Sequence, residues 1–432
     1  MRSEILFKNL LSATLDGDWG ESEPTPGHLP YRVIRGTDFP NAKLGITTDI
    51  PLRYIKKSTA KRRTLQPGDI IIETAGGSKN RPTGRTLFIT KDLLDSFDAP
   101  ATCASFCRFL RVKPAQADPA YIYWHLQNMY IRGLMWQHQV QHTGIARFQY
   151  TRFSESVTVK LPPLNKQRSI SLQLNTLNAK ITLNSKINRT LEAMARALFK
   201  SWFIAFDPVR AKMEGRQPAG LDPETAALFP ERLVDSELGL IPEGWEVKSL
   251  GEIMKKVSDG VDPDDLSPST PYIGLGDMPE RSIALDTWGQ AGDVNSRKSK
   301  FKKGQILFGR LRPYFHKVGI APVDGISSTD IQIIIPKKFE WYGYLVCMLS
   351  DPTFIDYCTS VSSGTRMPRV KWSDMQKYKI AIAPDKLADQ FTKWTQPVFK
   401  QIITNIFQNK TLEKQRDALL PALLSGVQVV ES

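Results

Sequence analysis

The last fifty residues of this 432-residue chain repeat a stretch from its middle. Residues 184–192, which read NSKINRTLE, return as residues 405–413, which read NIFQNKTLE, at an offset of 221 residues (405 − 184). Between residues 184 and 198, seven of fifteen positions are identical in the second copy. A repeat of half the chain length is longer than the units of repeat arrays, so it predicts a duplicated domain with pseudo-twofold symmetry.

Within each copy, the repeated part has the alternating four-and-three spacing of a coiled-coil seam. The first seam takes positions 170, 174, 177, 181, 184, 188, 191, 195, 198 and 202, and adding 221 gives the second, from 391 to 423. Both seams carry two asparagines at the same places, Asn184 and Asn188 in one and Asn405 and Asn409 in the other. A buried asparagine costs stability unless its amide is bonded, but it fixes register, so these four are candidate register determinants.

Each repeated part therefore predicts one helix of about 40 residues, or about 60 Å. Pro163 and Pro384 precede the two helices, while Pro208 and Gly426 follow them. Ordinary amphipathic packing of each helix on its own domain would also produce such a pattern. A mutual pair is favoured, because duplicated seams can bury each other and their asparagines can pair.

The part of each copy before the helix has mixed strand and helix signals. Residues 66–73 and 303–309 are short apolar runs entered through a glycine turn, as in buried strands, and aromatic-rich helical stretches follow at 120–135 and 341–357. We predict an α+β fold, in which two similar α/β domains are separated by two long helices that pair with each other as a coiled coil. The predicted parts are a first domain (1–158), a first long helix (159–206), a linker (207–244), a second domain (245–382) and a second long helix (383–432).

The composition favours a polyanionic partner. Lysine and arginine number 58 against 44 acidic residues, a net charge of +14, so nucleic acid is the first candidate and a basic surface without a ligand is the alternative. The chain shows neither an apolar run long enough to span a bilayer nor a signal peptide at its N-terminus. Four cysteines in this length favour buried free thiols in a reducing cytoplasm over a disulfide framework.

No catalytic centre is visible in the sequence. It lacks a phosphate-binding loop, a dinucleotide fingerprint after a strand, the tetrapeptide of amino-methyltransferases and a zinc-type spacing of cysteine and histidine. We therefore predict no catalytic residue, no metal site and no cofactor in this chain.

Four loops cluster cations, amides and aromatic residues next to glycine or proline, at residues 76–85, 141–150, 309–317 and 362–371. Arginine can bond guanine bidentately, amides can read adenine, and lysine mainly neutralises phosphate. A plain solvated loop is the alternative for each, but the loops recur at matched positions in the two copies. The candidate DNA-binding residues are Lys79, Asn80, Arg81, Arg85, Arg147, Gln149, Tyr150, Arg310, Arg312, Tyr314, His316, Lys317, Arg366, Arg369 and Lys371.

Two divergent domains on a rigid paired spacer would contact two short sequences on one double-stranded DNA. The spacer would set the distance between the half-sites, and divergent loops would let each half-site differ. The sequence thus favours recognition of a split site that need not be palindromic.

The chain resembles the specificity subunits of bacterial type I restriction–modification systems over essentially its whole length. Residues 241–253 (IPEGWEVKSLGEI) are similar to the entry of a target-recognition domain, and 303–310 (KGQILFGR) to the strand before its recognition loops. Residues 161–164 (LPPL) resemble the start of the first spacer helix, and 198–215 its end.

The resemblance implies two target-recognition domains, 1–158 and 245–382, whose two long spacer helices form an antiparallel coiled coil. It also implies a non-catalytic subunit that directs its partners to a bipartite DNA site. The expected partners are two modification (methyltransferase) subunits and the restriction subunits, with S-adenosylmethionine, ATP and Mg bound on those partners, in the cytoplasm and without a membrane. Two other classes stay open: a nuclease with a dispersed carboxylate site, and a coiled-coil adaptor that binds only proteins.

Overall fold

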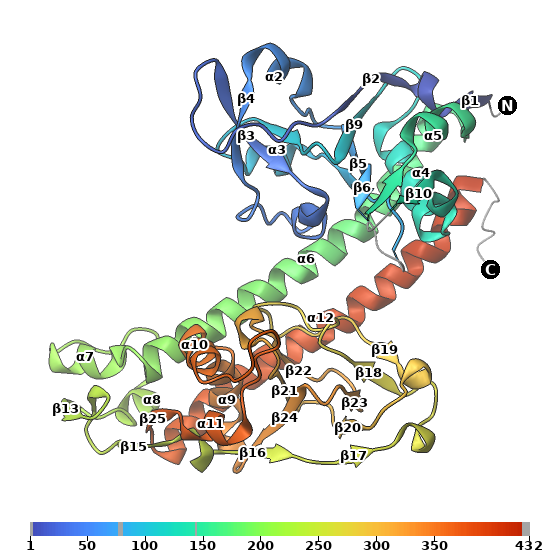
Figure 1. Ribbon diagram of the computed structural model, residues 1–432. Helices are drawn as coiled ribbons and strands as arrows, with labels where there is room; N and C mark the ends of the chain where they lie inside the picture. The colour runs from blue at the N-terminus through green and yellow to red at the C-terminus, as the bar shows by residue number, and fades with distance from the viewer. Residues whose placement is uncertain (1–2, 77–80, 143–144, 426–432) are drawn as a thin grey trace. The chain divides into compact units, whose positions relative to one another are not determined.

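The computed structural model describes residues 3–76, 81–142 and 145–425 and divides into two compact units (Figure 1). Unit 1 comprises Met1–Leu183 with Asn409–Ser432, and unit 2 comprises Asn184–Gln408. Each unit therefore takes one domain and one half of each long helix. The predicted domain boundaries remain predictions, since the division into units cuts through both helices.

The central sheet of unit 1 has four antiparallel strands in the order β2-β9-β5-β7. All four residues of β5 are buried, which fits the apolar run predicted at residues 66–73. Its strands are β2 (Leu11–Asp16), β9 (Cys107–Val112), β5 (Ile70–Glu73) and β7 (Thr86–Phe88).

Unit 2 contains the same sheet in the corresponding order, β16-β24-β21-β22, also antiparallel. The strand β21 is buried at every residue, as β5 is in unit 1. Its strands are β16 (Met254–Val257), β24 (Ile331–Pro336), β21 (Ile306–Gly309) and β22 (Val318–Ile320).

A second sheet in each unit repeats one parallel strand pair, β3 with β8 in unit 1 and β18 with β23 in unit 2. A short antiparallel pair also recurs, β1 with β12 and β15 with β25, and it joins the start of each domain to the strand before its long helix. These strands are β1 (Ser3–Leu6), β3 (His28–Ile34), β4 (Leu52–Lys56), β8 (Ala101–Cys103), β12 (Thr158–Leu161), β15 (Glu246–Ser249), β17 (Gly260–Val261), β18 (Pro271–Ile273), β19 (Gly289–Gln290), β20 (Lys298–Phe301), β23 (Gly325–Ser327) and β25 (Lys379–Ile382).

Helices cover the sheets where the aromatic-rich stretches predicted them. In unit 1, α4 buries Tyr121 and Trp124 in the main core, and in unit 2, α9 buries Tyr344. The domain helices are α1 (Phe39–Lys43), α2 (Lys57–Arg63), α3 (Lys91–Asp95), α4 (Pro119–Ile131), α5 (Tyr150–Ser156), α9 (Tyr342–Leu349), α10 (Pro352–Ser360) and α11 (Trp372–Lys377).

The two long helices are α6 (Leu164–Phe203) and α12 (Asp385–Ser425), of 40 and 41 residues. None of the predicted seam positions is exposed. In unit 2, Asn184 bonds Gln408 and Asn188 bonds Asn405, so the partner number falls as the helix number rises. This antiparallel pairing confirms the prediction of a mutual coiled coil.

The segment predicted as a linker, 207–244, contains short elements that pack on unit 2. They are α7 (Asp207–Met213), α8 (Pro223–Ala227) and the hairpin of β13 (Leu233–Ser236) with β14 (Gly239–Pro242). Phe229 of this segment is 2 % exposed, and its ring meets that of Trp202 edge-on at 5.3 Å. The segment therefore extends the core around the end of α6.

Candidate nucleic-acid interface

In unit 1, the structure brings the two predicted loops together. The strand β6 (Ala75–Gly76) pairs with β11 (Ile145–Phe148), so that Arg147 lies opposite Ala75. The strand β10 (Gln139–His142) completes this small antiparallel sheet on the other side of β11. Lys79 and Asn80 lie outside the described residues.

Beside this sheet, unit 1 has an open groove of about 770 Å³. Gln149 and Tyr150 line it and are half-buried, whereas Arg147, two residues before Gln149, is exposed. Arg81 of the other loop is also exposed. The guanidinium of Arg108 lies 4.5 Å from the ring centre of Tyr150 and is bonded to Asp16 through both carboxylate oxygens. The groove thus offers amide, aromatic and cationic groups together, which suits a nucleobase.

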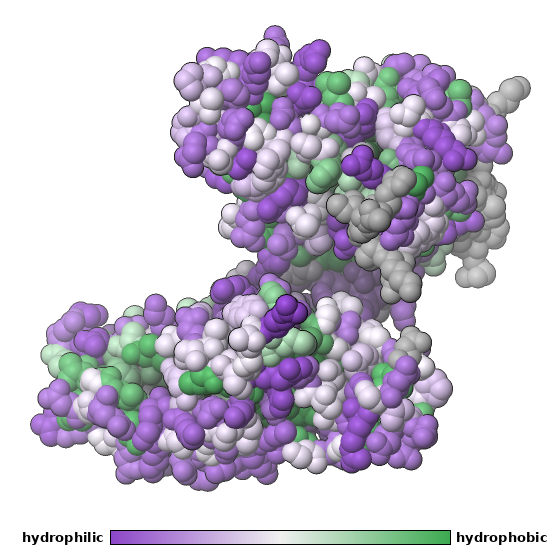
Figure 2. Space-filling model, in the orientation of Figure 1, coloured by the Kyte–Doolittle hydropathy of each residue, from purple (hydrophilic) through white to green (hydrophobic). Residues whose placement is uncertain are grey.

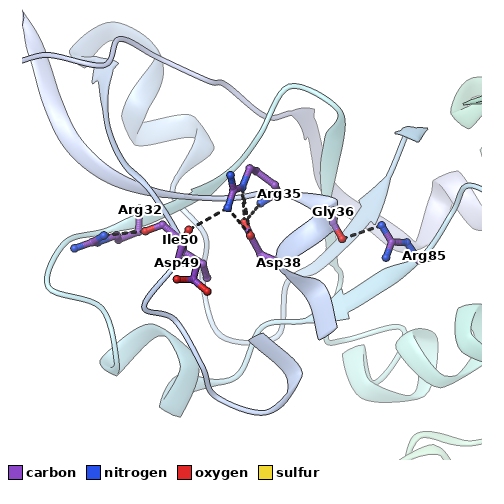
Figure 3. A network of polar contacts seen from close by, with 7 residues as sticks. All are labelled: Arg32, Arg35, Gly36, Asp38, Asp49, Ile50 and Arg85. Carbon is purple, nitrogen blue, oxygen red and sulfur yellow. Dashed lines mark hydrogen bonds and ion pairs between the residues drawn. The ribbon is translucent and has the colours of Figure 1, made fainter. Parts of the chain in front are cut away.

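Arg85 is half-buried, and its side chain is bonded within the domain. Its guanidinium donates to both carboxylate oxygens of Glu73, at 2.9 and 2.6 Å. It also donates to the carbonyl of Gly36, as Figure 3 shows. The same view shows Arg35 bonded to Asp38, which fixes the turn that contains Gly36. The bonds to Glu73 raise the pKa of Arg85, and they occupy the guanidinium within the domain.

In unit 2, the two predicted loops also meet. Leu311 and Arg369 form an isolated antiparallel bridge, the counterpart of Ala75 with Arg147. The backbone N–H of Arg312 donates to the carbonyl of Pro368 at 2.7 Å, and its side chain to the carbonyl of Arg366 at 3.0 Å. In each domain the two predicted loops are therefore joined by backbone pairing, and together they form one composite surface.

Several predicted residues of unit 2 are held by protein groups. Asp330 accepts two bonds from Arg369, at 2.8 and 3.1 Å, and lies 3.8 Å from the Nε atom of Arg310. Lys317 donates to the carbonyl of Leu275 at 2.6 Å. His316 is 4 % exposed and bonds the carbonyl of Ser350 at 2.7 Å, and burial lowers its pKa, so the ring is neutral at pH 7. The exposed candidates of unit 2 are Tyr314, Arg366 and Lys371.

Sequence reasoning missed one residue in each domain, Phe106 before the strand β9 in unit 1 and Asp330 before the strand β24 in unit 2. In unit 1, Thr74 donates from its backbone to the carbonyl of Phe106 at 2.8 Å; in unit 2, Arg310 donates likewise to Asp330 at 2.9 Å. The ring of Phe106 is 61 % exposed, whereas Asp330 holds two arginines. The matched backbone bonds show that the same corner carries different chemistry in the two domains.

The four predicted register asparagines bond across the helix pair. The Asn405 amide donates to the Asn188 oxygen at 2.8 Å, and Asn188 donates to the carbonyl of Ile402 at 3.3 Å. In unit 1, Asn409 donates to the carbonyl of Ile181, also at 3.3 Å. Since 181 and 188 become 402 and 409 on adding 221, the same bond forms in each unit with the two helices exchanged.

Among the described residues, no group of histidine, cysteine and acidic side chains could hold a metal ion. All four cysteines are free and buried, as predicted, and burial raises the pKa of Cys103 to about 12. Within the same residues, no helix combines the length and apolar character needed to cross a membrane.

Comparison with known proteins identifies the family. The model of the type I restriction modification DNA specificity domain matches residues 33–193 and 242–421. The HindI specificity subunit of Haemophilus influenzae is 27% identical over 316 residues, 63% of this chain and 69% of that protein. The MjaIX specificity subunit of Methanocaldococcus jannaschii is 28% identical over 296 residues, 64% of this chain but only 62% of the relative.

A solved structure shares the fold. The S subunit of a type I restriction–modification system from M. genitalium superposes with a TM-score of 0.54 at 14% identity, covering 98% of this chain and 96% of that one. Two matches to one family model fit the duplicated strand order of the two units. The chain therefore belongs to the type I restriction–modification DNA specificity family, as a specificity subunit with two recognition domains and a recognition role rather than a catalytic one.

Proposed function

We propose that this chain reads a bipartite site on double-stranded DNA, with one half-site per domain, and directs modification and restriction subunits to it. The observation that carries this proposal is the equivalent joining of two cationic loops in each domain, through Ala75 with Arg147 and Leu311 with Arg369. A composite surface of this kind can hold several base-contacting groups in one fixed arrangement, as direct readout requires.

Each domain has its own exposed candidate residues for contact with one half-site. In the first domain, Arg81 and Arg147 are exposed, and Arg147 directly precedes Phe148, which lines the groove together with Gln149 and Tyr150. In the second, Arg366 and Lys371 are exposed on the loop bonded to Arg312. The candidates held by protein groups support these surfaces from below, and their direct contact with DNA stays a prediction.

We assign partner docking to an apolar groove of about 1090 Å³ in unit 2, between α12 and the central sheet. Phe339 and Phe407 are 57 % and 37 % exposed in it, and the Lys303 amine lies 5.9 Å from the Phe407 ring centre. An apolar partner segment with acidic flanks would complement this groove. The first copy has Lys186 in place of Phe407, so it lacks this aromatic ring at the equivalent helix position.

The proposed occupant is a modification subunit, which would bind S-adenosylmethionine, while ATP and Mg would act on the restriction subunits. The buried free cysteines suit a reducing cytoplasm. Phe407→Asp should weaken capture of the modification subunit in a pull-down and leave DNA selection unchanged. Unchanged capture would place the docking surface elsewhere.

The DNA proposal is tested by selecting bound duplexes from a random library with the full chain. Two enriched sequences separated by an unselected gap are expected. Arg147→Ala should relax base choice in one half-site and Arg366→Ala in the other, each costing about 1–3 kcal/mol at the contacted base. Arg62→Ala and Lys255→Ala, exposed cations outside the loops, are the matched controls.

The alternatives give different results in the same assay. No enriched sequence would support a protein-only adaptor. Cleavage of DNA by the purified chain with Mg²⁺, abolished by a change at Asp or Glu, would support a nuclease. Equal loss at both half-sites from Arg366→Ala would show that this residue is structural.

A further inference from the structure

One turn of the second domain has two left-handed residues at its ends. The turn Pro313–Phe315 lies between Arg312, with φ of +50°, and His316, with φ of +53°. Non-glycine residues rarely adopt this conformation, and surrounding contacts must maintain it. Such a backbone therefore marks a turn whose shape the domain imposes.

The contacts that impose this shape lie on three sides. The Arg312 backbone is bonded to Pro368, and the His316 ring to the carbonyl of Ser350. The N–H of Arg281, itself left-handed with φ of +58°, donates to the His316 carbonyl at 3.0 Å. Pro313 is buried beneath the turn. The tip is thus preorganised before any ligand arrives.

This rigid tip points apolar groups to solvent. Tyr314 and Phe315 are 48 % and 37 % exposed, with ring centres 4.8 Å apart. On the neighbouring loop, Met367 is 47 % exposed next to the exposed Arg366. In Figure 2 the visible surface is mainly hydrophilic, with apolar residues in small separate patches. An apolar tip among cations fits the stacked bases of a polyanion better than it fits water.

We propose, on the basis of the DNA-reading function above, that Tyr314 and Phe315 form an aromatic wedge that enters one base step of the second half-site. Apolar side chains inserted between bases unstack and kink a duplex, and the flexible pyrimidine–purine steps resist this least. The corresponding loop of the first domain, residues 76–85, contains no aromatic residue. An aromatic turn at this position is therefore confined to the second domain, and the wedge is assigned to the second half-site.

The test uses the full chain and its selected duplex, with 2-aminopurine placed at successive positions of both half-sites. Fluorescence should rise on binding at one step of the second half-site and at none of the first. The double variant Tyr314→Ala/Phe315→Ala should lose this rise and bind that half-site roughly ten-fold or more weakly. Tyr314→Phe, which keeps both rings, should retain the rise, as should the control Trp394→Ala, an exposed aromatic on α12.

The outcomes separate the wedge from the function on which it rests. Selection of both half-sites with no rise at any position would overturn the wedge alone. A rise that persists in the double variant would do the same. Loss of modification-subunit capture in that variant, with DNA binding intact, would make the tip a protein-docking surface. Failure of the unaltered chain to select any sequence would overturn the DNA-reading function itself.

Discussion

The bond between Asn188 and Asn405 allows a test of how the helix pair keeps its register. Both side chains are nearly inaccessible, at 6 % and 3 % exposed, and the donor–acceptor distance is 2.8 Å. Gln401 donates to the Asn405 oxygen at 2.8 Å, so the Asn405 side chain accepts a bond from Gln401 and donates one to Asn188. Asn405→Leu removes the donor to Asn188 and leaves its oxygen buried without that bond.

The expected cost follows from the two parts of that loss. A neutral hydrogen bond contributes about 1 kcal/mol net, and a buried polar atom left unsatisfied costs about 1–3 kcal/mol, so Asn405→Leu should destabilise the helix pair by about 2–4 kcal/mol. Replacing both partners by leucine removes the unsatisfied atom as well as the bond. The double variant Asn188→Leu/Asn405→Leu should therefore be more stable than either single variant, but it should lose the requirement for one register.

Hydrogen exchange and spin-label distances measure these two effects separately. Amide hydrogen exchange in the parts of α6 and α12 that belong to unit 2 should be faster in either single leucine variant than in the double variant. Labels at the exposed Thr190 and Thr404 should show one distance in the native chain and a second population in the double variant, because a slip of one heptad moves a helix by about 10 Å. A single unchanged distance in the double variant would refute the register role, and a double variant weaker than both singles would refute the energetic argument.

Three further outcomes are expected. Burial raises the pKa of Glu192, so the carboxyl holds its proton more tightly in the folded chain than in the unfolded chain. The stability of unit 2 should therefore fall as pH rises from about 4.5 through the raised pKa. Glu192→Gln should abolish this pH dependence of the melting temperature. Asp330→Ala frees two arginines and should broaden base choice in the second half-site only, as library selection would show. Arg85→Ala leaves the buried Glu73 unpaired and should cost about 3 kcal/mol in thermal unfolding, whereas Arg81→Ala should change little.

Much of the architecture could be predicted because it depends on periodicity. The seam spacing predicted both long helices. The constant offset of 221 residues showed that the two asparagines occupy equivalent seam positions in both helices. The apolar runs after a glycine turn became the fully buried strands β5 and β21. These features follow from local chain geometry, which repeats along the sequence and needs no knowledge of tertiary contacts.

The roles of individual cations could not be predicted in this way. Arg85 and Arg366 have similar loop contexts, but Arg85 is bonded to Glu73 and Arg366 is exposed. The difference depends on whether a carboxylate elsewhere in the domain reaches the arginine. Asp330, in the turn before β24, is such a residue, and it is 39 positions from the Arg369 that it holds. Contacts at that separation leave no periodic trace in a single sequence.

The same comparison explains why one part of the duplication diverged more than the other. At the corner of each domain, the backbone bond uses only the carbonyl of Phe106 or Asp330, so the fold is kept whichever side chain stands there. In the helix pair, the bonds use the amides of Asn188 and Asn409 themselves, each to a carbonyl of the other helix. A side chain that forms such a bond cannot be replaced without losing the bond. Surfaces built on backbone bonds can therefore change in sequence more freely than the asparagines of the helix pair.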